Sequence, residues 1–81
     1  MALANLHNIE AEVLEFYVGE NSPVTKHQIK DLKLTSKAIF GGVIRDGLAL
    51  MTYGTFLIEP GDKVVMFCLP EAISEVEKLF N

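Results

Sequence analysis

Cysteine and clustered basic residues are both scarce in this sequence of 81 residues. The single cysteine, Cys68, excludes a disulfide within the chain and is typical of a reducing compartment. Lysine and arginine total 7 against 11 acidic residues, which gives a net charge of −4, and no basic run occurs. Because nucleic acids are usually bound by clustered lysine and arginine, we expect no nucleic-acid partner.

Long apolar runs are missing as well. No apolar stretch approaches the roughly 20 residues of a membrane-spanning helix, and no basic segment precedes a short apolar core as in a signal peptide. We therefore expect a cytoplasmic protein with no direct membrane insertion. So short a chain supports one core, so we expect one domain at residues 9–81, after a linker or an added start at residues 1–8.

Residues that carry catalysis or bind metals are few. His7 and His27 lie on separate segments, with no cysteine or carboxylate at ligand spacing. The serines have no histidine and aspartate in a nucleophile arrangement, and Gly41-Gly42 lacks the Lys and Ser/Thr of a phosphate-binding loop. Cys68 lies in an apolar run, which favours a buried, inert thiol. We expect no enzyme, no metal site and no cofactor in this domain.

Apolar residues, by contrast, make up 49% of the chain. So small a domain has little room to bury them all, so we expect some at a subunit or domain interface. Alternation and β-branched content predict five strands, at residues 11–18, 38–45, 48–51, 55–59 and 63–69. Asp46-Gly47 predicts a hairpin turn, and the paired glycines before it predict a bulge.

Two helices are predicted, at residues 25–33 and 70–80. Thr25 and Gln28 have capping-box spacing at the first, and Pro70 suits the first turn of the second. The resulting order, β-α-β-β-β-β-α, predicts an α+β fold with a mainly antiparallel sheet covered by two helices. The nearly continuous apolar run at residues 63–69 is typical of a central strand covered on both faces.

Two charged residues, Arg45 and Asp62, lie at predicted turns. Arg45 lies at the predicted hairpin tip, where it either forms a solvent-facing pair with Asp46 or meets an anionic ligand or partner subunit. Asp62 ends a Pro60-Gly61-Asp62 turn, where it is expected to bond the amides of its own loop.

Several of these segments, taken in order, resemble the C-terminal domain of the regulator-of-potassium-conductance family, the TrkA-C domain. The most distinctive is Glu59-Pro60-Gly61-Asp62-Lys63-Val64-Val65. The other matching segments are residues 11–16, 22–24, 31–32, 44–47, 70–73 and 76–80. The resemblance covers roughly residues 9–80.

The resemblance implies a regulatory module placed behind a dinucleotide-binding Rossmann domain. In that family the module pairs with a copy of itself, and a ligand in the groove of the pair biases the gate of a potassium transporter's membrane subunit. We therefore expect a homodimer, peripheral to the inner membrane through this partner. Any NAD would belong to the Rossmann domain and not to this one.

The resemblance also implies ligand-binding residues on the predicted hairpin. Ile39, Arg45 and Leu48 match positions with which some relatives bind cyclic di-adenosine monophosphate, whereas Val43 and Gly47 replace polar residues of that pattern. With Asp46 at the turn, the candidate ligand-binding set is Ile39, Arg45, Asp46 and Leu48. The ligand, a small molecule or a nucleotide, stays open.

Three other functions fit the same sequence. The domain could be a purely structural dimerisation module whose ligand groove is lost. Similar domains occur in other anion and amino-acid transporters, which gives a different host. A free-standing amino-acid-binding domain of similar α+β build is the third alternative.

Overall fold

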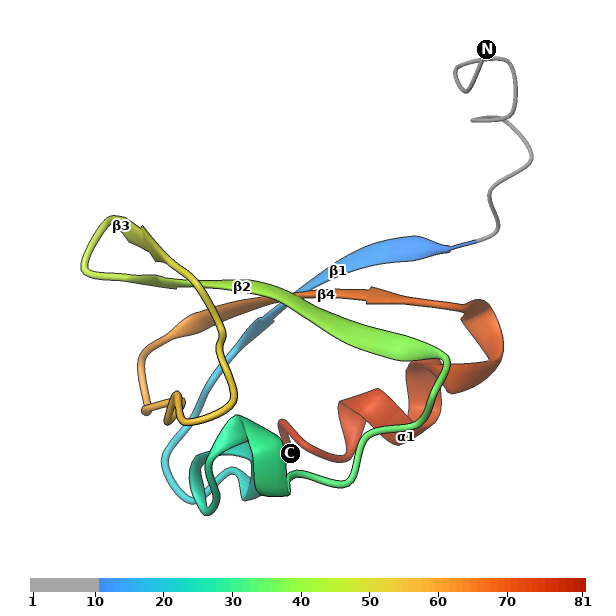
Figure 1. Ribbon diagram of the computed structural model, residues 1–81, viewed down its shortest axis with the longest axis horizontal. Helices are drawn as coiled ribbons and strands as arrows, with labels where there is room; N and C mark the ends of the chain where they lie inside the picture. The colour runs from blue at the N-terminus through green and yellow to red at the C-terminus, as the bar shows by residue number, and fades with distance from the viewer. Residues whose placement is uncertain (1–10) are drawn as a thin grey trace, which may run out of the picture.

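The computed structural model describes residues 11–81 as four strands and several short helices. The strands are β1 (Glu12–Tyr17), β2 (Ala38–Arg45), β3 (Leu48–Leu50) and β4 (Lys63–Cys68). Three 3-10 helices span Pro23–Thr25, Ile29–Asp31 and Pro70–Ala72, and the last leads into the α-helix α1 (Ile73–Glu77). The helices lie on one side of the sheet (Figure 1), and the predicted α+β class is confirmed. The predicted linker at residues 1–8 lies outside the described residues.

The four strands form one antiparallel sheet in the order β1-β4-β2-β3. Strand β4 is central, as predicted, because Phe67 pairs with Val13 of β1 on one edge and with Ile39 of β2 on the other. The register of β2 against β4 shifts between Phe40 and Gly42, so the predicted bulge at the glycine pair is confirmed.

The turn that joins β2 to β3 has the predicted hairpin geometry. Asp46 has a φ of 52° and Gly47 a φ of 78°. Two successive positive φ angles are what a two-residue type I′ turn requires, and glycine adopts them without a steric penalty. The Asp-Gly pair therefore fixes the register of the hairpin, in which Arg45 pairs with Leu48.

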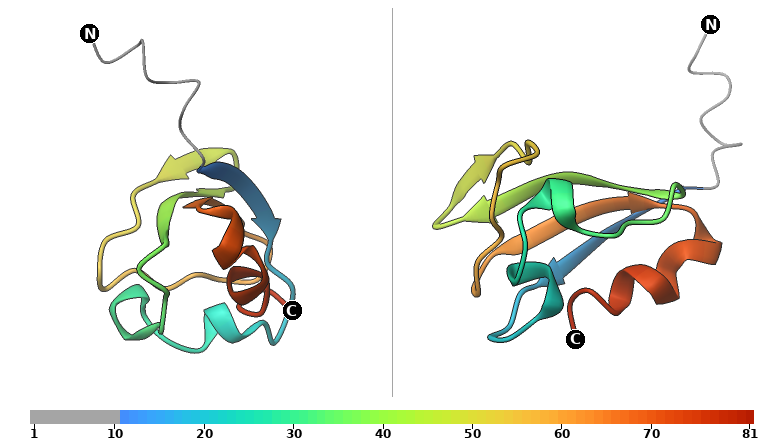
Figure 2. Two further views of the ribbon diagram at one scale, coloured as in Figure 1. Left: turned by 90° about the vertical axis from the view of Figure 1, so that its right-hand side faces the viewer. Right: turned by 60° about the horizontal axis from the view of Figure 1, so that its bottom comes forward.

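The core lies between the sheet and the helices. Alternate side chains of β4, namely Val64, Met66 and Cys68, are buried there, and Val76 of α1 is buried in the same cluster. Alternation along β4 thus sends one set of side chains inward and the other set to the opposite face. Two views in Figure 2 show the helices on a single face of the sheet.

The last residues of the chain contact β1 and the segment that follows it. The Ser22 hydroxyl donates to the Phe80 carbonyl at 3.2 Å, and the Val24 amide donates to the Leu79 carbonyl at 2.8 Å. The rings of Phe16 and Phe80 stack with their centroids 4.3 Å apart. These contacts close the core on the helical side, although α1 itself has only five residues and isolated helices of that length are unstable.

The predicted helix over residues 25–33 is wrong. Two separate 3-10 turns, Pro23–Thr25 and Ile29–Asp31, stand in its place. The Thr25 hydroxyl does not cap a helix but donates to the carbonyl of Ser22 at 2.8 Å. The second predicted helix exists in shorter form, as a 3-10 turn followed by α1.

The predicted strand over residues 55–59 is also wrong, and the two errors have one cause. The amide of Ile29 donates to the Phe56 carbonyl at 3.0 Å, and the amide of Lys30 donates to the Gly54 carbonyl at 2.8 Å. These segments therefore bond to each other across 24 to 27 residues of sequence, and they form neither the predicted helix nor the predicted strand. Tertiary hydrogen bonds of this kind override local patterns.

Candidate functional site

An ion pair between a partly exposed arginine and a buried aspartate joins the hairpin to the turn before β4. Arg45 donates from Nε and Nη2 to the two carboxylate oxygens of Asp62, each at 2.8 Å. Nη2 also donates to the Leu57 carbonyl at 3.1 Å, and Nη1 lies 3.4 Å from the Glu59 carboxylate. Asp62 is only 1% exposed. The two-pronged geometry is the one that arginine makes best with a carboxylate.

The same carboxylate also organises its own turn. The Glu59 amide donates to Asp62 at 2.9 Å, as the Pro60-Gly61-Asp62 motif predicts. Burial alone raises the pKa of Asp62, but the hydrogen bonds from Arg45 and from the Glu59 amide outweigh it and leave the pKa lowered. The hydrogen bond to Asp62 in turn raises the pKa of Arg45. The pair is therefore ionised on both sides at neutral pH.

Arg45 thus differs from the simpler of its two predicted roles. Its carboxylate partner is Asp62, not the neighbouring Asp46, and this partner is buried instead of solvent-facing. Sequence reasoning missed this pair. Arg45 is the last residue of β2, and Asp62 directly precedes β4. Because β2 and β4 are antiparallel and Ile44 pairs with Lys63, the two residues lie side by side, and this strand pairing is the signal that could have found them.

The four predicted ligand-binding residues do not form one pocket within this chain. Ile39 lies near the start of β2 and faces away from the helices, whereas Arg45 and Leu48 pair on the other face at the far end of the strand. At about 3.3 Å per residue, Ile39 and Arg45 lie roughly 20 Å apart along β2. Asp46 lies in the turn between Arg45 and Leu48. Their role in binding stays a prediction.

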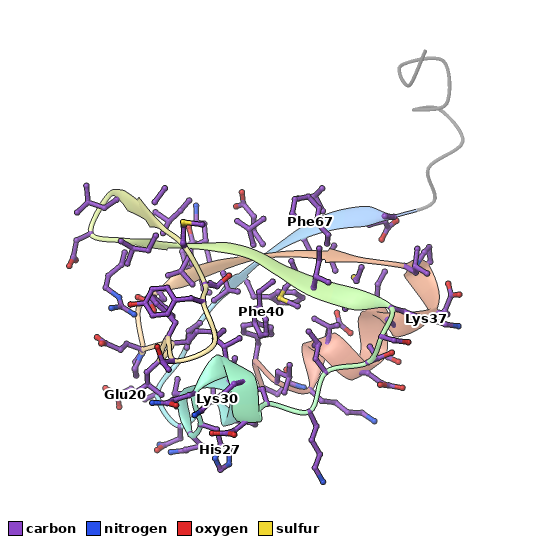
Figure 3. The ribbon with its side chains drawn as sticks, viewed as in Figure 1. Glu20, His27, Lys30, Lys37, Phe40 and Phe67 are labelled. Atoms are coloured by element: carbon purple, nitrogen blue, oxygen red, sulfur yellow. The ribbon has the colours of Figure 1, made fainter. Side chains whose placement is uncertain are left out.

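The face of the sheet away from the helices is mainly apolar, and nothing in residues 11–81 covers it. We call it the open face; its most exposed large side chains are Val13, Tyr17, Ile39, Ile44 and Phe67. Figure 3 shows Phe67 on this face and Phe40 on the opposite one. Phe67 is 41% exposed and Ile39 61% exposed. Among residues 11–81, the helices lie on one face of the sheet only, so these residues do not give β4 the coverage on both faces that its apolar run predicts.

The open face is not flat. A hollow of about 370 Å³, here named the glycine hollow, is lined by Gly41, Gly42, Ile44, Ala49, Met51 and Val65 among others. Beside it, the ring of Phe67 lies directly over Gly41, where an added Cβ would stand 2.5 Å from the ring carbon Cε2. The two glycines therefore create both the floor of the hollow and the seat of the neighbouring ring.

Charges on the open face balance one another. Among the positions of β1 to β4 that point to this face, only Glu15 and Lys63 are charged. Lys63 Nζ lies 3.6 Å from the Glu15 carboxylate and 5.1 Å from the centre of the Tyr17 ring. Contacts with Tyr17 and then Glu15 raise the pKa of Lys63, which is charged at neutral pH. The open face is thus neutral on a chain of net charge −4.

The described residues were also searched for metal ligands, a reactive thiol and a membrane-spanning helix. Between residues 11 and 81, no group of three or more His, Cys, Asp or Glu side chains is placed to hold a metal ion. Cys68 is buried as predicted, and burial raises the pKa of its thiol. No helix in the same range is long and apolar enough to cross a membrane.

These features define the class of the molecule, a small α+β domain whose antiparallel sheet is open and apolar on one face. Comparison with known proteins gives the family. Residues 13–81 match the TrkA-C domain, and the chain belongs to this family, as its sequence predicts.

Its relatives are longer proteins. The chain is 33% identical over 80 residues to the Trk system potassium uptake protein TrkA homolog 2 of Methanosarcina mazei. It is 35% identical over 73 residues to the Trk system potassium uptake protein TrkA of Azorhizobium caulinodans. The alignments cover 99% and 90% of this chain but only 18% and 15% of the relatives. The chain thus spans less than a fifth of their length.

A solved structure shares the fold. The structure described as an RCK domain with cda is similar to this chain with a TM-score of 0.71, over 85% of this chain and 97% of the other. The sequence identity is 16%, so the similarity concerns the fold. It confirms the predicted TrkA-C-like architecture.

Proposed function

We propose that this chain is a cytoplasmic regulatory domain that dimerises, senses a small-molecule or nucleotide ligand and biases the gate of a potassium-uptake protein. Family membership supports the potassium-uptake context, because the relatives are named as Trk potassium uptake proteins. In this proposal the domain binds the membrane subunit only through the rest of its protein. It has no catalytic role, and NAD is left to a separate Rossmann domain.

The open face is the observation that carries the proposal. A contiguous apolar face that is exposed on a domain marks an interaction surface. A domain that pairs through such a face can report a ligand, provided that the ligand prefers one arrangement of the pair over another. Of the predicted ligand residues, Ile39 lies on this open face, whereas Arg45 and Leu48 lie on the other face.

A purely structural dimerisation module is the second candidate. It is favoured by the contacts of Arg45, whose donors already bind Asp62 and the Leu57 carbonyl, with Glu59 nearby. An anionic ligand would have to share this guanidinium with two carboxylates. In a structural module, Arg45 would serve only the fold.

A thermal-shift screen of cyclic dinucleotides, nucleotides and simple ions separates the two candidates. A ligand at a hundredfold excess over its Kd adds about 2.7 kcal/mol of stability, which raises the Tm of a domain this size by several degrees. The sensor proposal predicts such a shift for at least one compound. No shift with any compound would favour the structural module.

Matched variants locate the effect. Leu48 and Tyr53 are similarly exposed, at 64% and 62%, but only Leu48 is a predicted ligand residue. We expect Leu48→Ser to reduce the ligand-dependent shift and Tyr53→Ser to leave it unchanged. Equal responses of the two variants would remove Leu48 from the site.

A further inference from the structure

We propose that Glu59 inhibits the predicted ligand site: its carboxylate lies at the one nitrogen of Arg45 that an anionic ligand can reach, and the ligand binds by displacing it. This inference rests on the proposed function, because it assigns a regulation to the same ligand site. Asp62 keeps its contact with Arg45 whether or not the ligand is bound.

The donors of the Arg45 guanidinium are not all used in the same way. Nε and Nη2 donate to the two carboxylate oxygens of Asp62, and Nη2 also donates to the Leu57 carbonyl. Because a guanidinium has five N–H donors, of which Nη1 carries two, these contacts use the three on Nε and Nη2. Nη1 instead forms the ion pair with Glu59, at 3.4 Å. An incoming anion therefore has to bind at Nη1, where it meets the Glu59 carboxylate.

The two carboxylates beside Arg45 differ in how firmly they are held. The Asp62 side chain is buried and also accepts from the Glu59 amide at 2.9 Å, so its carboxylate cannot leave without breaking the turn. The Glu59 side chain is 56% exposed. The backbone of Glu59 is fixed separately, since its carbonyl accepts from the Asp62 amide at 3.1 Å. The Glu59 carboxylate can thus turn into water while the turn keeps its hydrogen bonds.

The surroundings of the guanidinium restrict the direction from which an anion approaches. Cζ of Arg45 lies 5.1 Å from the centre of the Phe56 ring, so this buried ring covers one flat face of the guanidinium. The Arg45 side chain is 27% exposed. Because Nε and Nη2 point to the buried Asp62, the exposed edge is the one that carries Nη1.

Competition with Glu59 also selects the class of ligand. A free monoanion such as acetate gains little over a carboxylate that its own chain already holds beside Nη1, at a high effective concentration. A phosphate group carries more charge and offers oxygens that pair with a guanidinium. The net charge of −4 disfavours weakly bound anions further. We therefore expect the site to bind a phosphate-bearing small molecule and to ignore acetate at equal ionic strength.

Titration of the 81-residue chain with pyrophosphate tests the inference. Arg45 is the only arginine in the sequence, so its side-chain Nε–H gives a single NMR signal. The wild type, Glu59→Gln and Glu71→Gln are compared at constant ionic strength, with acetate as the second anion. Glu71 is the matched control, because its side chain is 58% exposed and pairs with Lys37 at 3.3 Å. Lys37 precedes β2, whereas Arg45 ends it.

We expect Glu59→Gln to lower the Kd for pyrophosphate about fivefold, the factor that an exposed ion pair contributes at most. Glu71→Gln should bind with the Kd of the wild type. The Nε–H signal should stay sharp in the bound state, because Asp62 keeps its hydrogen bond. Arg45→Lys retains a charge beside Asp62 but lacks Nη1, so it should not bind.

The contrary outcomes are distinct. If the three proteins bind pyrophosphate equally, Glu59 does not compete, and the inference is overturned while a ligand at Arg45 stands. If Glu59→Gln and Glu71→Gln tighten binding alike, net charge is the cause, and the inference is again overturned. If none binds, Arg45 takes no anion and the inference fails, whereas the proposed sensor is decided by the thermal-shift screen.

Discussion

At the scale of single residues, the pair of Arg45 and Asp62 connects three strands of the sheet. Asp62 is 1% exposed and accepts from the guanidinium and from the Glu59 amide. Its backbone carbonyl also accepts from the Val18 amide, which follows β1. One aspartate thus connects the end of β1, the end of β2 and the start of β4.

Substitution of Arg45 tests this role. Arg45→Ala leaves a buried carboxylate without its counter-ion, so we expect the free energy of unfolding to fall by about 3 kcal/mol, measured by urea denaturation. Lys37→Ala is the matched control, because it removes an exposed pair with Glu71 that is worth at most about 1 kcal/mol. Equal losses in the two variants would refute the buried-pair account.

The lowered pKa of Asp62 gives a second prediction at this scale. The folded state holds the proton less tightly than the unfolded state, so the contribution of Asp62 is complete above its unfolded pKa of about 3.9. It is lost as the pH falls below that value towards the lower folded pKa. We expect unfolding free energy to decline below about pH 4, and the decline to be smaller in Asp62→Asn. Parallel pH profiles for the two proteins would contradict this cause.

At the scale of elements, four of the five predicted strands are present and the last helix exists in shorter form, whereas the first predicted helix is absent, for a physical reason. The alternation of β1 and the Asp46-Gly47 turn depend on neighbours in sequence, and the structure confirms them. The segments near residues 29 and 56 depend on hydrogen bonds to each other. A helix of two turns is only marginally stable, so these hydrogen bonds replace it. The capping-box spacing at Thr25 therefore did not predict a helix correctly.

The bulge on β2 offers a prediction about a single element. A Cβ at Gly41 would stand 2.5 Å from the Phe67 ring, so Gly41→Ala must displace that ring from its seat. We expect a loss of about 1–2 kcal/mol in unfolding free energy, as for other overpacked sites. Gly54→Ala is the control, because its Cβ would make only an ordinary contact of 3.5 Å with Lys30.

A double-mutant cycle separates the clash from any backbone effect. If the ring causes the loss, Gly41→Ala should cost less in a Phe67→Ala background, with a coupling of at least about 0.5 kcal/mol. Additive costs would show that the glycine is required for the backbone of the bulge instead.

At the scale of the whole molecule, the sequence predicted a surplus of apolar residues for an interface, but not where they gather. The open face combines residues of β1, β2 and β4 that are up to 54 positions apart, such as Val13 and Phe67, and only the strand order places them together. The predicted ligand residues, by contrast, do not share one face of the sheet. They are close in sequence, but the alternation of β2 and the pairing with β3 send Ile39 and Leu48 to different faces.

Sedimentation equilibrium of the 81-residue chain, from micromolar to millimolar concentration, tests the central claim that the open face is covered by a second copy. The account predicts that the mass-average rises with concentration from 9.0 kDa towards twice that value, and that Phe67→Glu holds it at the lower value. A mass that stays at 9.0 kDa at every concentration would show that no second copy covers the face.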